Sequence, residues 1–186
     1  MTYNYMIAGV GGQGTVLASK LIAAAAMKKG FDVRTTETIG MAQRGGCVFG
    51  HCRIGENIFS PLIPLGTATT LIAFEPAEAV RQLPYLSKDG SMIVSDLAIT
   101  PITGGYDASV MLDYLKANVK NLIVVDGYSL ISHNSKTLNV SLLGAATESG
   151  LFPFDADTLK EVIPEMLPEQ FWDMNLKAFE FGRSKV

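Results

Sequence analysis

The sequence has few of the residues that hold metal ions or cross-link a chain. Its cysteines are Cys47 and Cys52, and its histidines are His51 and His133. Two cysteines are too few to ligate an iron–sulfur cluster alone. Five positions apart on one strand, they are expected to point to opposite faces and to be small buried thiols in a reducing compartment. We therefore expect this chain to hold no metal ion.

Long apolar runs and basic clusters are also missing. No stretch of about 18 uninterrupted apolar residues occurs, so we expect no membrane span. The segment Met1–Tyr5 lacks the basic start and cleavage site of a signal peptide, and a cytoplasmic location is therefore expected. The formal charge is only −3 and no block of Lys and Arg stands out, so nothing supports nucleic-acid binding.

Apolar residues, in contrast, are abundant. They make up 48% of the 186 residues, whereas charged residues make up 18%, which is a low charged fraction for a soluble protein. A chain of this length suits one domain with a substantial core. Either a sheet covered on both faces or a surface meant for a partner chain explains the composition, and both can hold.

The first third of the chain has the pattern of a βαβ unit. Asn4–Ala8 is expected to form a strand that leads into the loop Gly9–Gly14. Thr15–Lys29 is rich in Ala, Leu and Ile and ends in two lysines before Gly30, which predicts a helix with cations in its last turn. Asp32–Glu37 is then expected to form a second strand, joined to the first by a right-handed crossover.

The remaining elements continue the alternation of strands and helices. Cys47–Ile54 follows too soon for a helical crossover, so this strand is expected to pair antiparallel or to lie at a sheet edge. Further strands are expected at Thr69–Phe74, Ser91–Ser95 and Leu122–Asp126, and helices at Glu75–Tyr85, Asp107–Asn118, Asn139–Glu148, Asp155–Ile163 and Pro168–Gly182. We therefore expect residues 1–186 to form a single α/β domain, with a Rossmann-like βαβ start and a mainly parallel sheet covered by helices on both faces.

The first glycine loop is a candidate ligand-binding motif. The residues Gly9, Val10, Gly11, Gly12, Gln13 and Gly14 satisfy G-x-G-x-x-G between a strand and a helix. Such a loop lets backbone N–H groups approach an anion at the helix N-terminus. Glu37 ends the second strand at about the distance where a dinucleotide site places its ribose-binding acid. Two alternatives stay open: a nicotinamide or flavin site, or glycines that only let helix and strand pack closely.

A second dense loop follows the second strand. It runs from Thr36 to Gly46 and brings three glycines, Arg44 and Glu37 to the carboxyl end of the sheet, on the side of the first glycine loop. Arg44 beside Gly45 and Gly46 could bind a phosphate or carboxylate in bidentate fashion. The alternative is an ion pair between Arg44 and Glu37 that shapes the loop.

Other polar positions have simpler explanations. Glu78 and Arg81 are three apart on an expected helix and are expected to form a solvated ion pair. Asp96 and Asp126 each follow a strand, where capping or turn formation is the common role. His51 and His133 have no evident nucleophile to activate, so we expect no catalytic residue in this chain.

The two loops together resemble a known family. The order G-V-G-G-Q-G and then E-T-I-G-M-A-Q-R-G-G before a strand is similar to the gamma-type domain of pyruvate and 2-oxoacid:ferredoxin oxidoreductases. The sequence of residues 40–46 is most similar to the corresponding segment of the small (beta) subunits of the indolepyruvate branch. Three later segments agree and extend the resemblance over nearly the whole chain: Ser60–Pro64, Phe74–Arg81 and Asn175–Phe179.

The resemblance implies a division of labour between two chains. A large (alpha) subunit would hold thiamine diphosphate, Mg²⁺ and 4Fe–4S clusters, and this chain would hold none of them alone. The hetero-oligomer would oxidatively decarboxylate an aryl-2-oxoacid such as indolepyruvate, with coenzyme A as co-substrate and ferredoxin as electron acceptor. The positions implied for contact with coenzyme A, or with the partner subunit, are Gly9, Gly11, Gly12, Gln13, Gly14, Arg44, Gly45 and Gly46.

Two other functions remain to be weighed against this one. The G-x-G-x-x-G motif and Glu37 would suit a stand-alone protein that binds NAD or FAD. Alternatively, the chain could be an assembly module without a small-molecule site, with both glycine loops forming a subunit interface.

Overall fold

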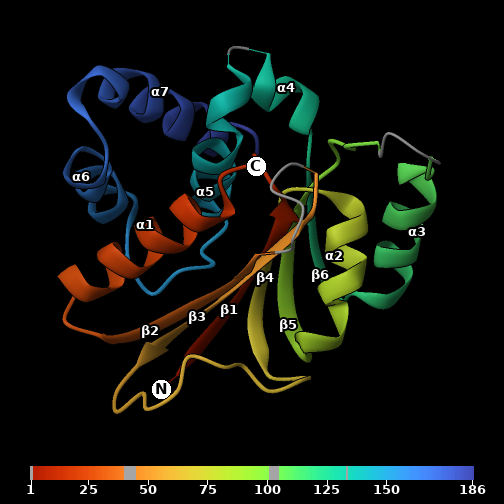
Figure 1. Cartoon of the computed structure of the whole chain (residues 1–186), viewed down its shortest axis with the longest axis horizontal. Coiled ribbons are helices and arrows are strands. Elements are labelled where there is room, and N and C mark those ends of the chain that lie inside the picture. Colours follow the sequence, from red (N-terminus) through yellow and green to blue (C-terminus); the bar gives the residue numbers. More distant parts are fainter. Residues whose placement is uncertain (1, 40–44, 101–104, 133) are drawn as a thin grey trace.

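A six-stranded sheet forms the centre of the molecule (Figure 1). The computed structural model describes residues 2–39, 45–100, 105–132 and 134–186. The order of the strands across the sheet is β2 (Asp32–Ile39), β3 (Cys47–Gly55), β1 (Tyr3–Val10), β4 (Ala68–Ala73), β5 (Leu86–Ser95) and β6 (Asn121–Val125). Strand β3 is antiparallel to both of its neighbours, and β1, β4, β5 and β6 are parallel to one another.

Helices cover both faces of this sheet. On one face lie α1 (Thr15–Lys28), α4 (Gly127–Ile131), α5 (Leu138–Glu148), α6 (Ala156–Met166) and α7 (Trp172–Arg183). On the other lie α2 (Pro76–Gln82) and α3 (Ala108–Asn118). Short 3₁₀ turns complete the set: η1 (Leu83–Tyr85), η2 (Ser135–Thr137) and η3 (Glu169–Phe171). The expected α/β fold with a mainly parallel sheet is therefore confirmed.

Strand β1 shows how the two-sided cover arises. Its residues 5–8 are fully buried and alternate between the faces, because successive side chains of a strand point in opposite directions. Tyr5 and Ile7 join the core under α1 and α5, while Met6 and Ala8 join the core under α2 and α3. A strand buried on both faces is apolar throughout, which explains the high apolar content of the chain.

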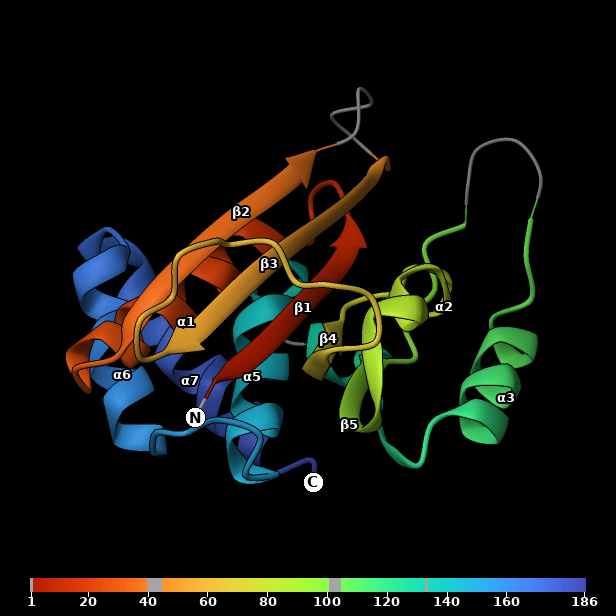
Figure 2. The same cartoon turned by 90° about the horizontal axis from the view of Figure 1, so that it is seen from below.

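Strand β3 lies inside the sheet. Its antiparallel pairing was expected, but the alternative of an edge position is wrong, because β3 is inserted between β2 and β1. Residues 56–67 then connect β3 to β4 without forming a helix or strand (Figure 2). None of the helices in the described part of the chain is both long enough and apolar enough to cross a membrane.

Candidate functional site

The first glycine loop is held together by the side chain of Gln13. Gln13 is buried, and its Oε1 accepts a hydrogen bond from the N–H of Val10 at 2.8 Å. Its Nε2 donates to the carbonyl oxygen of Phe74 at 2.9 Å. The amide thus joins the carboxyl end of β1 to the residue that follows β4. The sequence predicted a glycine loop here but did not predict this structural role of Gln13.

Three glycines of this loop are required for different reasons. A Cβ on Gly9 would lie 2.8 Å from Gln13 Oε1 and 2.9 Å from Thr15 Cγ2, so any larger residue would displace them. Gly14 has φ +77° and faces the side chain of Asn139, whose Nδ2 donates to the Gly14 carbonyl. Gly12 has φ +104°, but the space beyond it is open. Gly12 therefore presents bare backbone to whatever approaches the loop.

The second glycine loop meets the first directly. The N–H of Gly11 donates to the carbonyl oxygen of Gly46 at 2.8 Å, and the N–H of Gly45 donates to the carbonyl oxygen of Gly11 at 3.4 Å. The structure therefore brings the two predicted loops together at the carboxyl end of β1; we call this pair of loops the glycine clasp (residues 9–14 and 45–46). Arg44 lies outside the described residues, and its predicted contact stays a prediction.

The clasp uses part of its donors internally. The N–H groups of Gly11, Gln13 and Gly45 already donate to backbone carbonyl oxygens. Helix α1 begins after Gly14, and the backbone of Gly14 has a left-handed conformation. No side chain of the described residues caps the first turn of the helix. The N–H groups of that first turn carry the positive end of the helix dipole. Anion binding at the clasp would therefore use this turn rather than the N–H groups of Gly11, Gln13 and Gly45.

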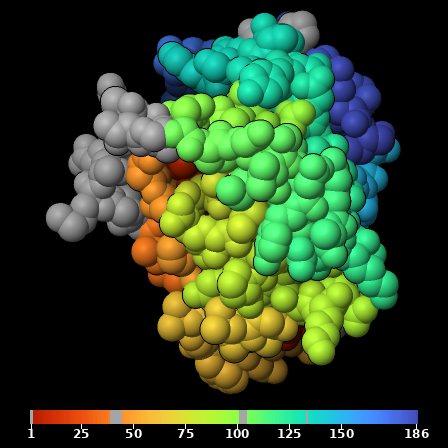
Figure 3. All heavy atoms as spheres, turned by 90° about the vertical axis from the view of Figure 1, so that its right-hand side faces the viewer, coloured from red at the N-terminus to blue at the C-terminus, as the bar shows by residue number. Residues whose placement is uncertain are grey.

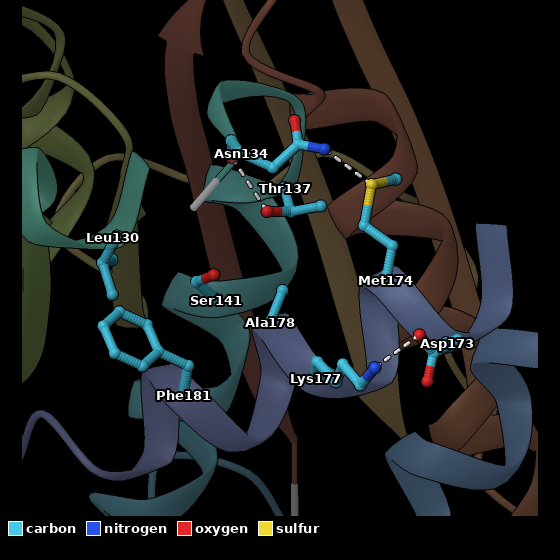
Figure 4. A pocket seen from close by; sticks show the side chains of 9 residues that line it. All are labelled: Leu130, Asn134, Thr137, Ser141, Asp173, Met174, Lys177, Ala178 and Phe181. Carbon is cyan, nitrogen blue, oxygen red and sulfur yellow. Dashed lines mark hydrogen bonds and ion pairs between the residues drawn. The ribbon is translucent and has the colours of Figure 1, made fainter. Parts of the chain in front are cut away.

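A cavity of about 450 Å³ lies elsewhere, between α4, η2, α5 and α7 (Figure 4). Asp173 and Lys177 form an ion pair of 2.7 Å at its rim, and the hydroxyl of Ser141 has no hydrogen-bond partner among the described residues. No motif pointed to this cavity, because its lining comes from four separate elements. Its walls are mostly hydrocarbon, contributed by residues such as Leu130 and Ala178.

A second cavity, of about 620 Å³, borders the glycine clasp. Its lining includes Val10, Gly45, Cys47, Glu75 and Glu78. Glu75 caps α2, and its Oε2 accepts a hydrogen bond from the N–H of Glu78 at 2.9 Å. Both carboxylates are buried, and each has one oxygen without a hydrogen-bond partner among the described residues. This wall of the cavity is therefore acidic.

The electrostatics of that wall follow from its burial. Loss of hydration raises the pKa of the Glu75 carboxyl, and the neighbouring Glu78 carboxylate raises it further, although the N–H groups of Glu78 and Ala77 oppose both effects. Arg81 Nε lies 3.2 Å from Glu78 Oε1. The pair was expected to be solvated, but only Arg81 is exposed. The wall therefore holds two buried carboxyl groups beside one exposed guanidinium.

The cysteines and His51 take part in packing and hydrogen bonding within the fold. Cys52 is buried among the α1-side core, whereas Cys47 faces Glu78 and Gln82 on the other side of β3. The expected opposite faces are confirmed, but the expected burial is wrong for Cys47, which is only half-buried. Desolvation raises the pKa of Cys47 to about 11 and that of Cys52 to about 12. His51 accepts the N–H of Ile63 on Nδ1 at 3.2 Å, and burial lowers its pKa. His133 lies outside the described residues.

The expected acid of a dinucleotide site is misplaced for that role. In such folds β2 lies beside β1, so that its terminal carboxylate reaches the ligand at the glycine loop. Here Glu37 pairs with Gly50 of β3, and Gly50 pairs in turn with Ile7 of β1. Two strand spacings separate Glu37 from β1, which is roughly 10 Å. The topology therefore disfavours the NAD or FAD alternative.

Asp96 and Asp126 have the capping and turn roles expected of them. Asp126 Oδ1 accepts the N–H of Ser129 and caps α4, and Asp96 Oδ1 accepts the N–H of Gly127 at 2.7 Å. Among the described residues, no group of three or more His, Cys, Asp or Glu side chains is placed to hold a metal ion.

Comparisons with known proteins add a family and a fold. The family model described as pyruvate ferredoxin/flavodoxin oxidoreductase matches residues 4–185. Indolepyruvate oxidoreductase subunit IorB of Pyrococcus horikoshii is 36% identical, over 97% of this chain and 94% of that protein. IorB of Archaeoglobus fulgidus is 37% identical, over 100% and 96%. The gamma subunit of a keto/oxoacid ferredoxin oxidoreductase from Geobacter sulfurreducens superimposes with a TM-score of 0.73 at 20% identity, over 100% and 96%, and shows the fold.

Proposed function

Because the chain belongs to the pyruvate ferredoxin/flavodoxin oxidoreductase family, we propose that it is the small accessory subunit of an indolepyruvate (aryl-2-oxoacid):ferredoxin oxidoreductase. The observation that carries this proposal is the end-to-end match to IorB subunits at 36–37% identity. A match over the full length of both proteins supports the role of a whole subunit, whereas a match to one shared loop would support only a shared motif.

The proposed reaction converts an arylpyruvate and coenzyme A into an aryl-acetyl-CoA and CO₂, and transfers two electrons to ferredoxin. Thiamine diphosphate with Mg²⁺ would supply the decarboxylation chemistry, and iron–sulfur clusters would carry the electrons. The described residues of this chain do not fit an iron–sulfur cluster. Cys47 and Cys52 lie on opposite faces of β3 with raised thiol pKa values, so they cannot share a cluster. The cofactors are therefore assigned to a larger partner subunit.

The part that we assign to this chain is to complete the enclosure around coenzyme A. The glycine clasp lies at the carboxyl end of the sheet, where ligands of open α/β sheets gather. The uncapped first turn of α1 and the guanidinium of Arg44 would attract phosphate groups. The acidic wall at Glu75 and Glu78 would keep those phosphates away from the neighbouring cavity.

Co-purification tests the subunit assignment. The chain and the large subunit encoded in the same organism are co-expressed with an affinity tag on the large subunit alone. We expect the two chains to elute together at a fixed ratio after gel filtration. Elution of this chain entirely by itself would contradict the proposal. Titration of the isolated chain with NAD(H) and FAD tests the alternative function, and saturable binding of either would favour it.

A further inference from the structure

The segment between β3 and β4 exposes more hydrocarbon than a connecting loop needs. We call residues 56–67 the strap; Figure 2 shows it crossing in front of β3 and β1 on its way to β4. Phe59 is 92% exposed, Leu62 60% and Leu65 66%. Residues 57–67 contain no charged side chain. Apolar groups exposed together in this way mark a surface for a partner.

The strap is fixed to the sheet by its other residues. Ile58 and Ile63 are buried. Arg53 Nη1 donates to the carbonyl oxygens of Ser60 at 3.1 Å and of Leu62 at 3.4 Å. The N–H of Gly66 donates to the carbonyl oxygen of Pro84 at 2.9 Å. The three exposed side chains therefore project from a backbone that is fixed to the sheet. Because this backbone is already ordered, less conformational entropy is lost on binding.

The three exposed side chains recur at a regular interval along the strap. Phe59, Leu62 and Leu65 are three residues apart, and Pro61 and Pro64 repeat at the same interval. The strap is not extended throughout, because the N–H of Thr67 donates to the carbonyl oxygen of Pro64 at 3.3 Å and closes a turn around Leu65 and Gly66. The backbone carbonyls of Ser60 and Leu62 already accept bonds from Arg53. Recognition would thus use the apolar side chains rather than addition of a strand.

We propose that the strap is an apolar anchor that inserts into a concave hydrophobic groove of the larger partner subunit. This inference rests on the proposed function, which supplies that partner. Apolar, uncharged patches that lie on a rigid backbone form the cores of protein interfaces, with polar residues around them. Figure 3 shows the strap, in gold, forming one end of the molecule.

A second copy of this chain is a poorer binding partner for the strap than the larger subunit is. A stable specific interface buries about 800 Å² per partner, and three side chains supply only part of that area. A two-fold contact through the strap would set these three side chains against the same three of the other copy, and would supply no further apolar area. The strap therefore suits one anchor within a larger interface, whose remaining area lies elsewhere on the chain.

The position of the strap separates its role from that of the glycine clasp. The strap precedes β4, whereas the clasp follows β1, so the two lie at opposite ends of these parallel strands (Figure 1). A change in the strap is therefore expected to weaken assembly and to leave the KM for coenzyme A of the assembled enzyme unchanged.

The first test compares affinities for the purified large subunit. We expect the double variant Phe59→Ser/Leu62→Ser of the full chain to bind at least tenfold more weakly than the wild type. The matched control is Met27→Ser, which removes a side chain that is 64% exposed on α1 and should bind normally. Equal affinities of wild type and double variant would overturn the anchor. Failure of the wild type to bind would contradict the proposed function instead.

The second test remains decisive even if the double variant folds poorly. The photoreactive residue p-benzoylphenylalanine replaces Phe59 in one sample and Met27 in another, and each complex is irradiated. We expect a covalent product with the large subunit only from position 59. A product that joins two copies of this chain, or no product from position 59 in an intact complex, would overturn the proposal.

Discussion

Gln13 shows how one side chain can determine the shape of a loop. Its amide satisfies one N–H and one carbonyl oxygen at the ends of two strands. Gln13→Ala should leave both buried groups without a partner, at about 1–3 kcal/mol each. We expect the free energy of unfolding, measured with urea, to fall by about 2 kcal/mol or more. Gln170→Ala, at an exposed position, is the control and should change it by less than about 0.5 kcal/mol. Equal effects would refute the bridging role.

Glu75 gives a prediction about pH. Its pKa is raised in the folded chain, so the folded state binds the proton more tightly than the unfolded state. The buried charge therefore destabilises the fold above that pKa, and stability is regained as pH falls through it. Glu75→Gln should raise the melting temperature near pH 8 and lose this gain towards pH 4.5. A lower melting temperature of the variant at pH 8 would contradict a destabilising charge at Glu75.

Arg44 carries the coenzyme A part of the proposed function. Loss of a charge-assisted contact costs about 1.5–3 kcal/mol, or roughly ten- to 150-fold in affinity. Arg44→Ala should raise the KM for coenzyme A of the reconstituted enzyme by about this factor, and Arg44→Lys should raise it less. The melting temperature of the free chain should hardly change. A drop of several degrees with an unchanged KM would instead indicate a structural ion pair.

At the scale of elements, the contact between α5 and α7 is the tightest in the helical layer. A Cβ on Gly182 would collide with the backbone carbonyl of Ser141, and one on Gly144 would collide with that of Phe179. Gly182→Ala should therefore push the helices apart and lower the free energy of unfolding by about 1–3 kcal/mol. Gly105→Ala, which meets only an ordinary contact, is the control. Unfolding curves that coincide for all three proteins would contradict this close packing.

The elements predicted from the sequence are those with a strong local signal. Buried runs such as β1 were expected, and so was a helix over Asp107–Asn118; the side chain of Asp107 caps this helix, α3. Helix α4 was not predicted, because five residues are too short to show a helical period. Strand β5 begins at Leu86 rather than Ser91, since Lys88, Asp89 and Gly90 resemble a turn. The place of β3 depends on pairing with distant strands, which no local pattern encodes.

At the scale of the whole molecule, the sequence predicted which loops meet but not what surrounds them. The glycine clasp joins the two loops that carried the family resemblance. The acidic wall beside it could not be foreseen, since the burial of Glu75 and Glu78 depends on how α2 packs against the sheet. From the sequence, Ser60–Pro64 of the strap contributed only to the family resemblance, because the exposure of its side chains is a property of the folded chain.

The most direct test of the central claim is activity as a function of subunit ratio. Indolepyruvate- and coenzyme A-dependent reduction of a viologen dye is followed while this chain is added to a fixed amount of large subunit under anaerobic conditions. The chain alone should give no reduction, and the rate should rise with each addition until it levels off at a fixed ratio of the two subunits. Turnover by this chain alone would contradict the claim. So would a rate of the large subunit that does not change when this chain is added.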